Sequence, residues 1–93
     1  MPGAADATVY RKVPAVERNL ANARLLVQRI DKGKAVQLSG SAPLIWDLLD
    51  SHHTVAQVVD QLVERFSDSR EMIEAGVRAA LDSFVSQELV VVE

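Results

Sequence analysis

Residues 35–66 read AVQLSGSAPLIWDLLDSHHTVAQVVDQLVERF, and this stretch decides the fold. Its first residues alternate apolar and polar side chains, which is typical of a strand with one buried face. Ser41 can cap a helix that carries Pro43 in its first turn. Thr54 can cap a second helix, whose apolar residues return at helical spacing as far as Phe66. The stretch therefore predicts a strand that leads into two amphipathic helices.

Upstream of this stretch, residues 23–30 (ARLLVQRI) alternate their side chains between two faces and predict another strand. Gly33, in the DKGK turn that follows, can take a positive φ at no steric cost, so residues 35–39 return as the second strand of a hairpin. Residues 16–20 can pair as a first strand, and Pro14 would be acceptable at the start of an edge strand.

Downstream, Asp68 or Ser69 can cap a third helix that runs to about Gln87. Each helix has an apolar stripe that we expect to form the core. The stripes comprise Leu44, Ile45, Trp46, Leu48 and Leu49 in the first helix; Val55, Val58, Val59, Leu62, Val63 and Phe66 in the second; and Ile73, Val77, Ala80, Leu81, Phe84 and Val85 in the third. Residues 89–92 (LVVV) then predict a short return strand or a docked tail.

The length of 93 residues is enough for one domain with a single compact core. We expect residues 1–8 to be a disordered N-terminal tail and residues 9–93 to form that domain. A hydrophobic content of 48% and a charged content of 25% are those of a folded soluble protein. Without cysteine, a signal core or a membrane-length apolar run, the sequence favours the reducing cytoplasm.

The charges divide unevenly along the chain. Residues 1–40 hold seven bases and three acids, a net +4, whereas residues 41–93 hold three bases and ten acids, a net −7. Because phosphate neutralisation supplies most non-specific affinity for DNA, acidic helices argue against a nucleic-acid reader.

The third helix has a second flank of mostly small residues: Met72, Ala75, Gly76, Ala79, Ser83 and Ser86. Small side chains let another backbone approach a helix closely, so this flank could be one wall of a peptide groove. Helix propensity offers a simpler explanation, because alanine is the best helix former.

The sequence gives little support for catalysis or metal binding. His52 and His53 are adjacent rather than at a ligand spacing, so we expect them in a solvated interhelical loop. No nucleophile triad or glycine-rich phosphate loop can be assembled, and we predict a protein that is not an enzyme and that needs no cofactor or metal. Trp46 could anchor a partner, but a core position with its indole N–H bonded to a carbonyl is the favoured interpretation.

The order and spacing of these segments resemble the PqqD-like family, whose members are also called recognition elements for ribosomally made, modified peptides. The resemblance covers residues 16–89. It rests on the hairpin ARLLVQRIDKGKAVQLS, the junction LSGSAPLIWDLLD, the helix TVAQVVDQLVERF and the exit VRAALDSFVSQELV. Ser39 departs from the family pattern, which often has asparagine there.

This resemblance implies an α+β, winged-helix-like fold, with a three-stranded antiparallel sheet followed by three helices. It also implies that the chain binds the leader segment of a precursor peptide by strand addition and presents it to a modifying enzyme, such as a radical S-adenosylmethionine enzyme or a leader peptidase, with no nucleic acid or membrane as partner. The expected peptide-binding residues are Ala35, Val36, Gln37, Leu38 and Ser39 on the strand and Met72, Ala75, Gly76, Ala79 and Ser83 on the third helix. A winged-helix nucleic-acid binder and a structural subunit of a larger enzyme remain as alternatives.

Overall fold

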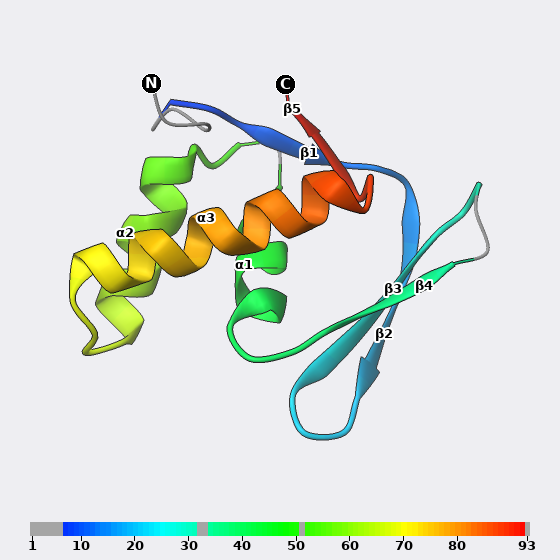
Figure 1. Cartoon of the computed structure of the whole chain (residues 1–93), viewed down its shortest axis with the longest axis horizontal. Helices are drawn as coiled ribbons and strands as arrows, with labels where there is room; N and C mark the ends of the chain where they lie inside the picture. The colour runs from blue at the N-terminus through cyan, green and yellow to red at the C-terminus, as the bar shows by residue number, and fades with distance from the viewer. Residues whose placement is uncertain (1–6, 32–33, 51, 93) are drawn as a thin grey trace.

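The computed structural model describes residues 7–31, 34–50 and 52–92. Three strands form an antiparallel sheet in the order β2–β3–β4, with β2 at Ala15–Leu20, β3 at Arg24–Arg29 and β4 at Ala35–Leu38. Three helices follow: α1 at Ala42–Leu48, α2 at Val55–Arg65 and α3 at Arg70–Ser86. They lie together on one side of the sheet (Figure 1). The predicted α+β, winged-helix-like architecture is confirmed.

The sheet is apolar on the face that meets the helices. Leu25 pairs with Leu38 and Val27 pairs with Val36, and three of these four side chains are buried. Because side chains alternate along a strand, this register turns the neighbouring residues of β3 and β4 to the opposite face. The alternation expected for both strands is therefore confirmed.

A second, two-stranded sheet joins the two ends of the described chain. In it, β1 at Tyr10–Lys12 pairs antiparallel with β5 at Val90–Val92, and Val13 N–H donates to the Leu89 carbonyl over 2.9 Å. The predicted C-terminal strand is present, but its partner was not foreseen, because three residues that pair with a segment nearly 80 positions away carry no local signal. Figure 1 shows β5 rising from the C-terminal end of α3 to meet β1.

The described chain is anchored before Val9. Thr8 accepts a hydrogen bond from Val55 N–H at 2.9 Å, and Val9 forms an isolated bridge with Thr54. Thr8, which we assigned to the N-terminal tail, is thus joined to the start of α2 by a backbone hydrogen bond. Residues 1–6 and the expected turn at Gly33 lie outside the described residues.

Trp46 lies at the centre of the core with 0% of its surface exposed, which rules out a role as an exposed anchor. Its ring meets Phe84 edge to face, with centroids 5.4 Å apart, and the Lys12 ammonium lies 4.9 Å from the ring centroid. The predicted bond from its indole N–H to a carbonyl is wrong, since Nε1 has no partner among the described residues. Packing of the ring, rather than a hydrogen bond, therefore holds Trp46 in place.

The three helix caps differ in strength. Thr54 accepts from Gln57 N–H while the Gln57 side chain accepts from Thr54 N–H, which forms a complete capping box. Ser69, rather than Asp68, caps α3. Ser41 precedes α1 but its side chain makes no cap bond, because its backbone is already helical (φ −84°, ψ −8°) instead of extended.

Two expected core residues are exposed instead. Phe66 is 41% exposed, because the backbone becomes extended at this residue and leaves the helical repeat of α2 (φ −121°, ψ 150°). Val85 is 46% exposed, since it lies about 100° around α3 from buried Phe84. Both corrections leave the main stripes of α2 and α3 in the core.

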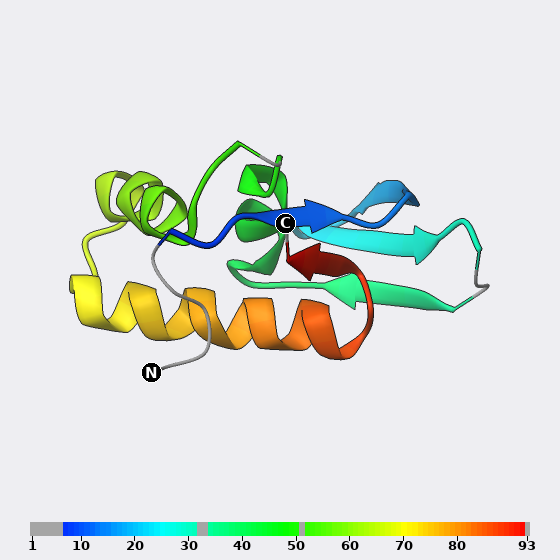
Figure 2. The same ribbon diagram turned by 90° about the horizontal axis from the view of Figure 1, so that it is seen from above.

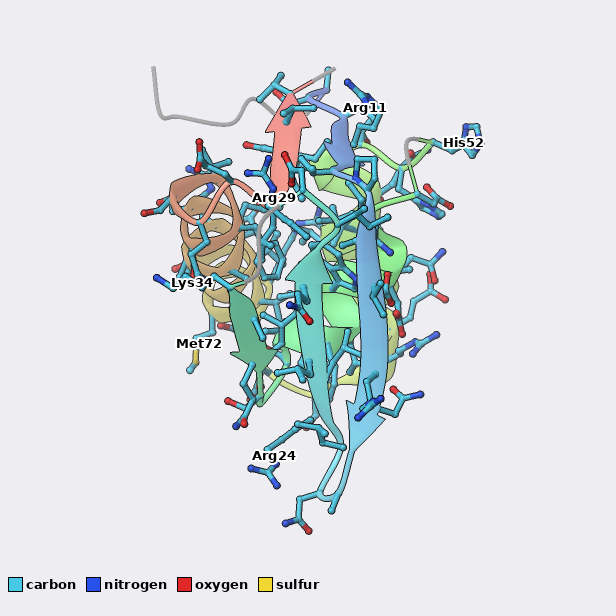
Figure 3. All side chains as sticks on the ribbon, turned by 90° about the vertical axis from the view of Figure 1, so that its right-hand side faces the viewer. Arg11, Arg24, Arg29, Lys34, His52 and Met72 are labelled. Atoms are coloured by element: carbon cyan, nitrogen blue, oxygen red, sulfur yellow. The ribbon has the colours of Figure 1, made fainter. Side chains whose placement is uncertain are left out.

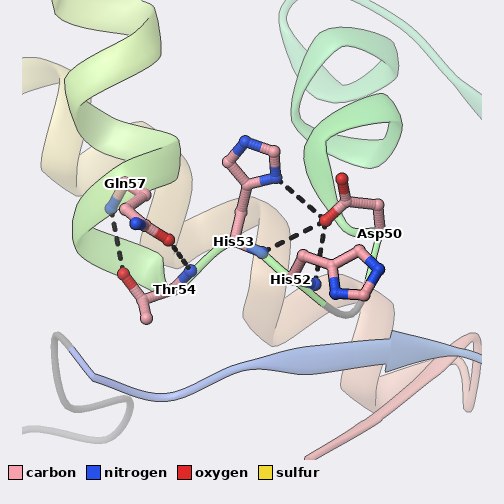
Figure 4. Close-up of polar contacts among 5 residues, drawn as sticks. All are labelled: Asp50, His52, His53, Thr54 and Gln57. Atoms are coloured by element: carbon pink, nitrogen blue, oxygen red, sulfur yellow. Dashed lines mark hydrogen bonds and ion pairs between the residues drawn. The ribbon is translucent and has the colours of Figure 1, made fainter.

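The loop between α1 and α2 is organised by Asp50 (Figure 4). Its carboxylate accepts from the backbone N–H groups of His52 and His53, at 2.9 and 3.1 Å, and lies 2.9 Å from Nδ1 of the His53 ring. These contacts, the His53 ring first among them, hold the pKa of Asp50 well below its usual range. The two histidines thus belong to a structured connection.

The caps give a direct stability prediction. Thr54→Ala removes the capping box and should lower the free energy of unfolding by about 1 kcal/mol. Ser41→Ala, at the matched position of α1, should change it by less than about 0.5 kcal/mol, because no cap bond is lost. Urea denaturation of the two variants checks this, and equal losses would contradict it.

Asp50 gives a prediction for pH dependence. A carboxyl whose pKa is depressed in the folded state stabilises that state fully above the ordinary value of about 3.9, and this stabilisation is lost as the pH falls through the depressed pKa. Wild type should therefore lose stability below about pH 4 more steeply than Asp50→Asn, whose amide does not titrate. Thermal unfolding of both proteins between pH 2 and 7 measures this, and parallel curves would be inconsistent with it.

Candidate functional site

One edge of the three-stranded sheet is open beside a helix. Among the described residues β4 pairs only with β3, and α3 runs alongside its other edge (Figures 2 and 3). An unpaired strand edge presents a row of N–H and C=O groups that can hydrogen-bond to another chain. The open strand edge that the family resemblance implies is present at β4.

The strand register shows which backbone groups of β4 point outward. Ile30 N–H donates to the Pro14 carbonyl over 3.1 Å. Backbone bonding alternates along an antiparallel strand, so Gln28, Leu26 and Arg24 of β3 bond to β2 as well. The residues between them, Leu25 and Val27, bond to their β4 partners Leu38 and Val36. The backbone groups of Ala35 and Gln37 therefore face outward, towards the open edge.

The side chains of β4 divide in the same alternating way. Leu38 is buried with 4% exposure and Val36 packs partly against the core, whereas Ala35, Gln37 and Ser39 are exposed. A strand that lies along this edge would thus meet the backbone of Ala35 and Gln37.

On α3, an uncharged stripe of residues spaced by three or four faces this edge: Met72, Gly76, Ala79 and Ser83. All four are exposed, and Met72 is 67% exposed. Ala75 is also exposed but is turned further round the helix. We refer to the space between this stripe and β4 as the β4–α3 groove.

Two hollows mark the ends of the groove. The first, of about 170 Å³, is mostly apolar and is lined by Ser41, Ile45, Leu62, Phe66, Asp68, Met72, Ile73, Gly76 and Val77. The second, of about 400 Å³, is lined by Arg29, Lys34, Val36, Ser86, Gln87, Glu88 and Leu89. Each hollow joins residues of α3, or of the turn that follows it, to residues next to or within β4.

Gly76 is not required by the packing of the free protein. A Cβ added at Gly76 would meet nothing within 4 Å, yet a glycine inside a helix costs about 1 kcal/mol relative to alanine. The absence of a side chain keeps the first hollow open. This fits the interpretation of the small flank as a wall that leaves room for another chain.

The charge of Arg29 at the second hollow is neutralised within the protein. The guanidinium of Arg29 contacts the Asp31 carboxylate over 2.6 and 2.9 Å and donates to the Glu88 carbonyl over 3.1 Å. Hydrogen bonding to Asp31 is the main cause that raises the pKa of Arg29. Arg29 thereby ties the end of β3 to the turn after α3.

Sequence reasoning missed several residues at the ends of the groove. Ser41 and Ile45 come from the start of α1, and Phe66 and Asp68 from the connection between α2 and α3, and only the folded chain brings these two segments together. Phe66 did carry a signal, since it ends an apolar stripe next to polar residues, but we assigned it to the core. Lys34 and Gln87 are polar residues that nothing in the sequence distinguishes from other surface positions.

Other kinds of site find no support in the described parts of the chain. Within residues 7–31, 34–50 and 52–92, no group of three or more histidines or acids is arranged to hold a metal ion. Across the same ranges, no helix has the length and apolar character needed to cross a membrane.

Comparisons with known proteins agree with this geometry. A solved structure described as "TbiB1 in Complex with the TbiA(beta) Leader Peptide" has the same fold, with a TM-score of 0.71 and 21% sequence identity over 94% of this chain and 92% of that chain. No curated protein matches. The family model for coenzyme PQQ synthesis protein D (PqqD) matches residues 24–90, which include β3, β4, all three helices and the start of β5. The chain therefore belongs to the PqqD family.

Proposed function

We propose that the protein is a non-enzymatic adaptor that binds the leader segment of a ribosomally made precursor peptide in the β4–α3 groove. The observation that carries this proposal is the pair of outward-facing backbones at Ala35 and Gln37, opposite an uncharged helix flank. Membership of the PqqD family supports it. So does the related fold of TbiB1, whose structure is described as a complex with a leader peptide.

Two edges of the sheet are open, that of β4 and that of β2, and β4 is better suited to strand addition. Among the described residues β2 also pairs only with β3. Pro14, Glu17 and Arg18 lie along it, however, and prolines and charges are the usual means by which a protein keeps an edge unpaired. β4 has no charged residue between Ala35 and Ser39. A leader strand would gain main-chain hydrogen bonds from β4 and apolar contacts from α3.

In this proposal the adaptor presents the bound leader to a modifying enzyme, for which a radical S-adenosylmethionine enzyme and a leader peptidase are the two candidate classes. The nucleic-acid alternative has weaker support. The charges of α3 include exposed Glu71 and Asp82, which would repel phosphate. No contact within residues 7–31, 34–50 and 52–92 favours a purely structural subunit over a peptide binder.

Proline substitution tests strand addition. Gln37→Pro removes an outward N–H and leaves the bonds from β4 to β3 intact, so it should weaken leader binding about tenfold, the cost of one main-chain hydrogen bond. Asn19→Pro makes the same change on the open edge of β2 and should leave the affinity unchanged. Isothermal titration uses the synthetic leaders of short precursor peptides found among the genes next to that of this chain. The proposal is wrong if wild type gives no heat, or if both variants bind alike.

Two substitutions at Gly76 are expected to affect stability and leader binding differently. Gly76→Ala should raise the free energy of unfolding by roughly 0.5–1 kcal/mol, because the added Cβ has room and alanine favours the helix. Gly76→Met should fill the first hollow and weaken leader binding at least fivefold. Asp82→Met, on another exposed side of α3, should bind as wild type does. Urea denaturation and titration measure the two effects, and undiminished binding by Gly76→Met would contradict the role of the hollow.

A further inference from the structure

The side of the three-stranded sheet that faces away from the helices is uncovered. Figure 3 looks onto this outer face, with the helices behind the sheet. The register places Arg18 opposite Leu26, Leu26 opposite Gln37, and Val16 opposite Gln28, all on this side. Ile30 continues the same alternation one residue beyond β3.

The outer face is more apolar than a solvated sheet face. Antiparallel sheets with one face in water normally turn polar side chains outward. Here Ile30 is 70% exposed and Val16 is 61% exposed, and half-buried Leu26 lies diagonally across from Val16. Beside Ile30, a hollow of about 200 Å³ is lined by Val13, Pro14, Ile30 and Asp31. These features suit the apolar centre of an interface.

The charged side chains that the strands turn to the outer face have one sign, and Asp31, which lines the hollow, has its carboxylate paired with the Arg29 guanidinium. The strand positions that point to this side include Arg18 and Arg24 and no acid. The three helices on the other side of the sheet carry six acids and three bases. A second copy docked through the same face would bring like charges together, whereas a partner with acidic residues would complement them.

The outer face is also continuous with the open edge of β4. The side chains of Ala35 and Gln37 lie on this face, while their backbones point towards the groove. A leader strand added there would extend the sheet by one strand, and every second leader side chain would join the outer face. One partner could therefore contact the adaptor and its bound leader at the same time.

We propose that the outer face docks the enzyme that modifies the precursor, through an enzyme surface that combines acidic and apolar residues. This inference rests on the proposed function. Arg18 and Arg24 meet the acidic residues, Val16 and Ile30 meet the apolar ones, and the hollow beside Ile30 accepts one apolar side chain. The enzyme thereby recognises the adaptor that has bound a leader.

The test uses the full chain and a modifying enzyme of the proposed classes found among the genes next to its own. Arg18→Glu combined with Ile30→Asp should weaken binding of the enzyme to the adaptor–leader complex at least tenfold, measured by surface plasmon resonance. The matched control, Arg65→Glu combined with Val85→Asp, makes the same changes at exposed positions of α2 and α3 and should bind the enzyme as wild type does. Higher salt should weaken the wild-type complex more than that of Arg18→Glu.

Leader titration and enzyme binding without leader separate the two proposals. We call Arg18→Glu combined with Ile30→Asp the outer-face variant. If it binds the leader as wild type does but no longer binds the enzyme, the docking face is supported. The docking-face proposal is wrong if wild type and the outer-face variant bind the enzyme equally well. It is also wrong if the control variant loses as much enzyme binding as the outer-face variant, or if the wild-type adaptor binds no enzyme. If wild type binds the enzyme but not the leader, the proposed function fails, and the outer-face variant still decides the docking surface.

Discussion

β4 is hydrogen-bonded on one side only, and α3 is held beside its other side without closing onto it. The hydrogen bonds of β4 to β3 use the backbones of Val36 and Leu38, which leaves those of Ala35 and Gln37 facing the groove. An unsatisfied backbone group is tolerable in water but costly when buried. The backbone groups at the groove are solvated in the free protein, and a ligand that covers them must replace those hydrogen bonds. The groove therefore favours an extended peptide, which supplies matching N–H and C=O groups.

The position of α3 depends on parts of the molecule that lie outside the groove. At its C-terminal end, Leu89 N–H donates to the Phe84 carbonyl, and Val13 N–H donates to the Leu89 carbonyl. Glu88, between the helix and β5, adopts a left-handed conformation (φ 60°) that reverses the chain. Near the same end, Phe84 packs edge to face on Trp46 of α1. These contacts fix α3 to the small sheet and to α1, so the groove keeps its width.

Much of the fold could be predicted from local patterns. The alternation in residues 24–29 and 35–38 and the helical spacing of α2 and α3 identified these elements because each has one buried face. The pairing of β1 with β5 could not be predicted, since it joins the two ends of the chain through segments of three residues. The open edge of β4 was expected from the family resemblance. Its outward residues, however, required the register, which places Ala35 and Gln37 at the edge and turns Val36 and Leu38 inward.

Amide hydrogen exchange at single residues tests the central claim most directly. In the free protein, the amides of Val36 and Leu38 should exchange slowly, because β3 accepts their hydrogen bonds, and those of Ala35 and Gln37 should exchange quickly. Saturation with the leader peptide should slow Ala35 and Gln37 by at least tenfold. If the leader binds and these two amides still exchange as in the free protein, the peptide does not pair with β4 and the account is wrong.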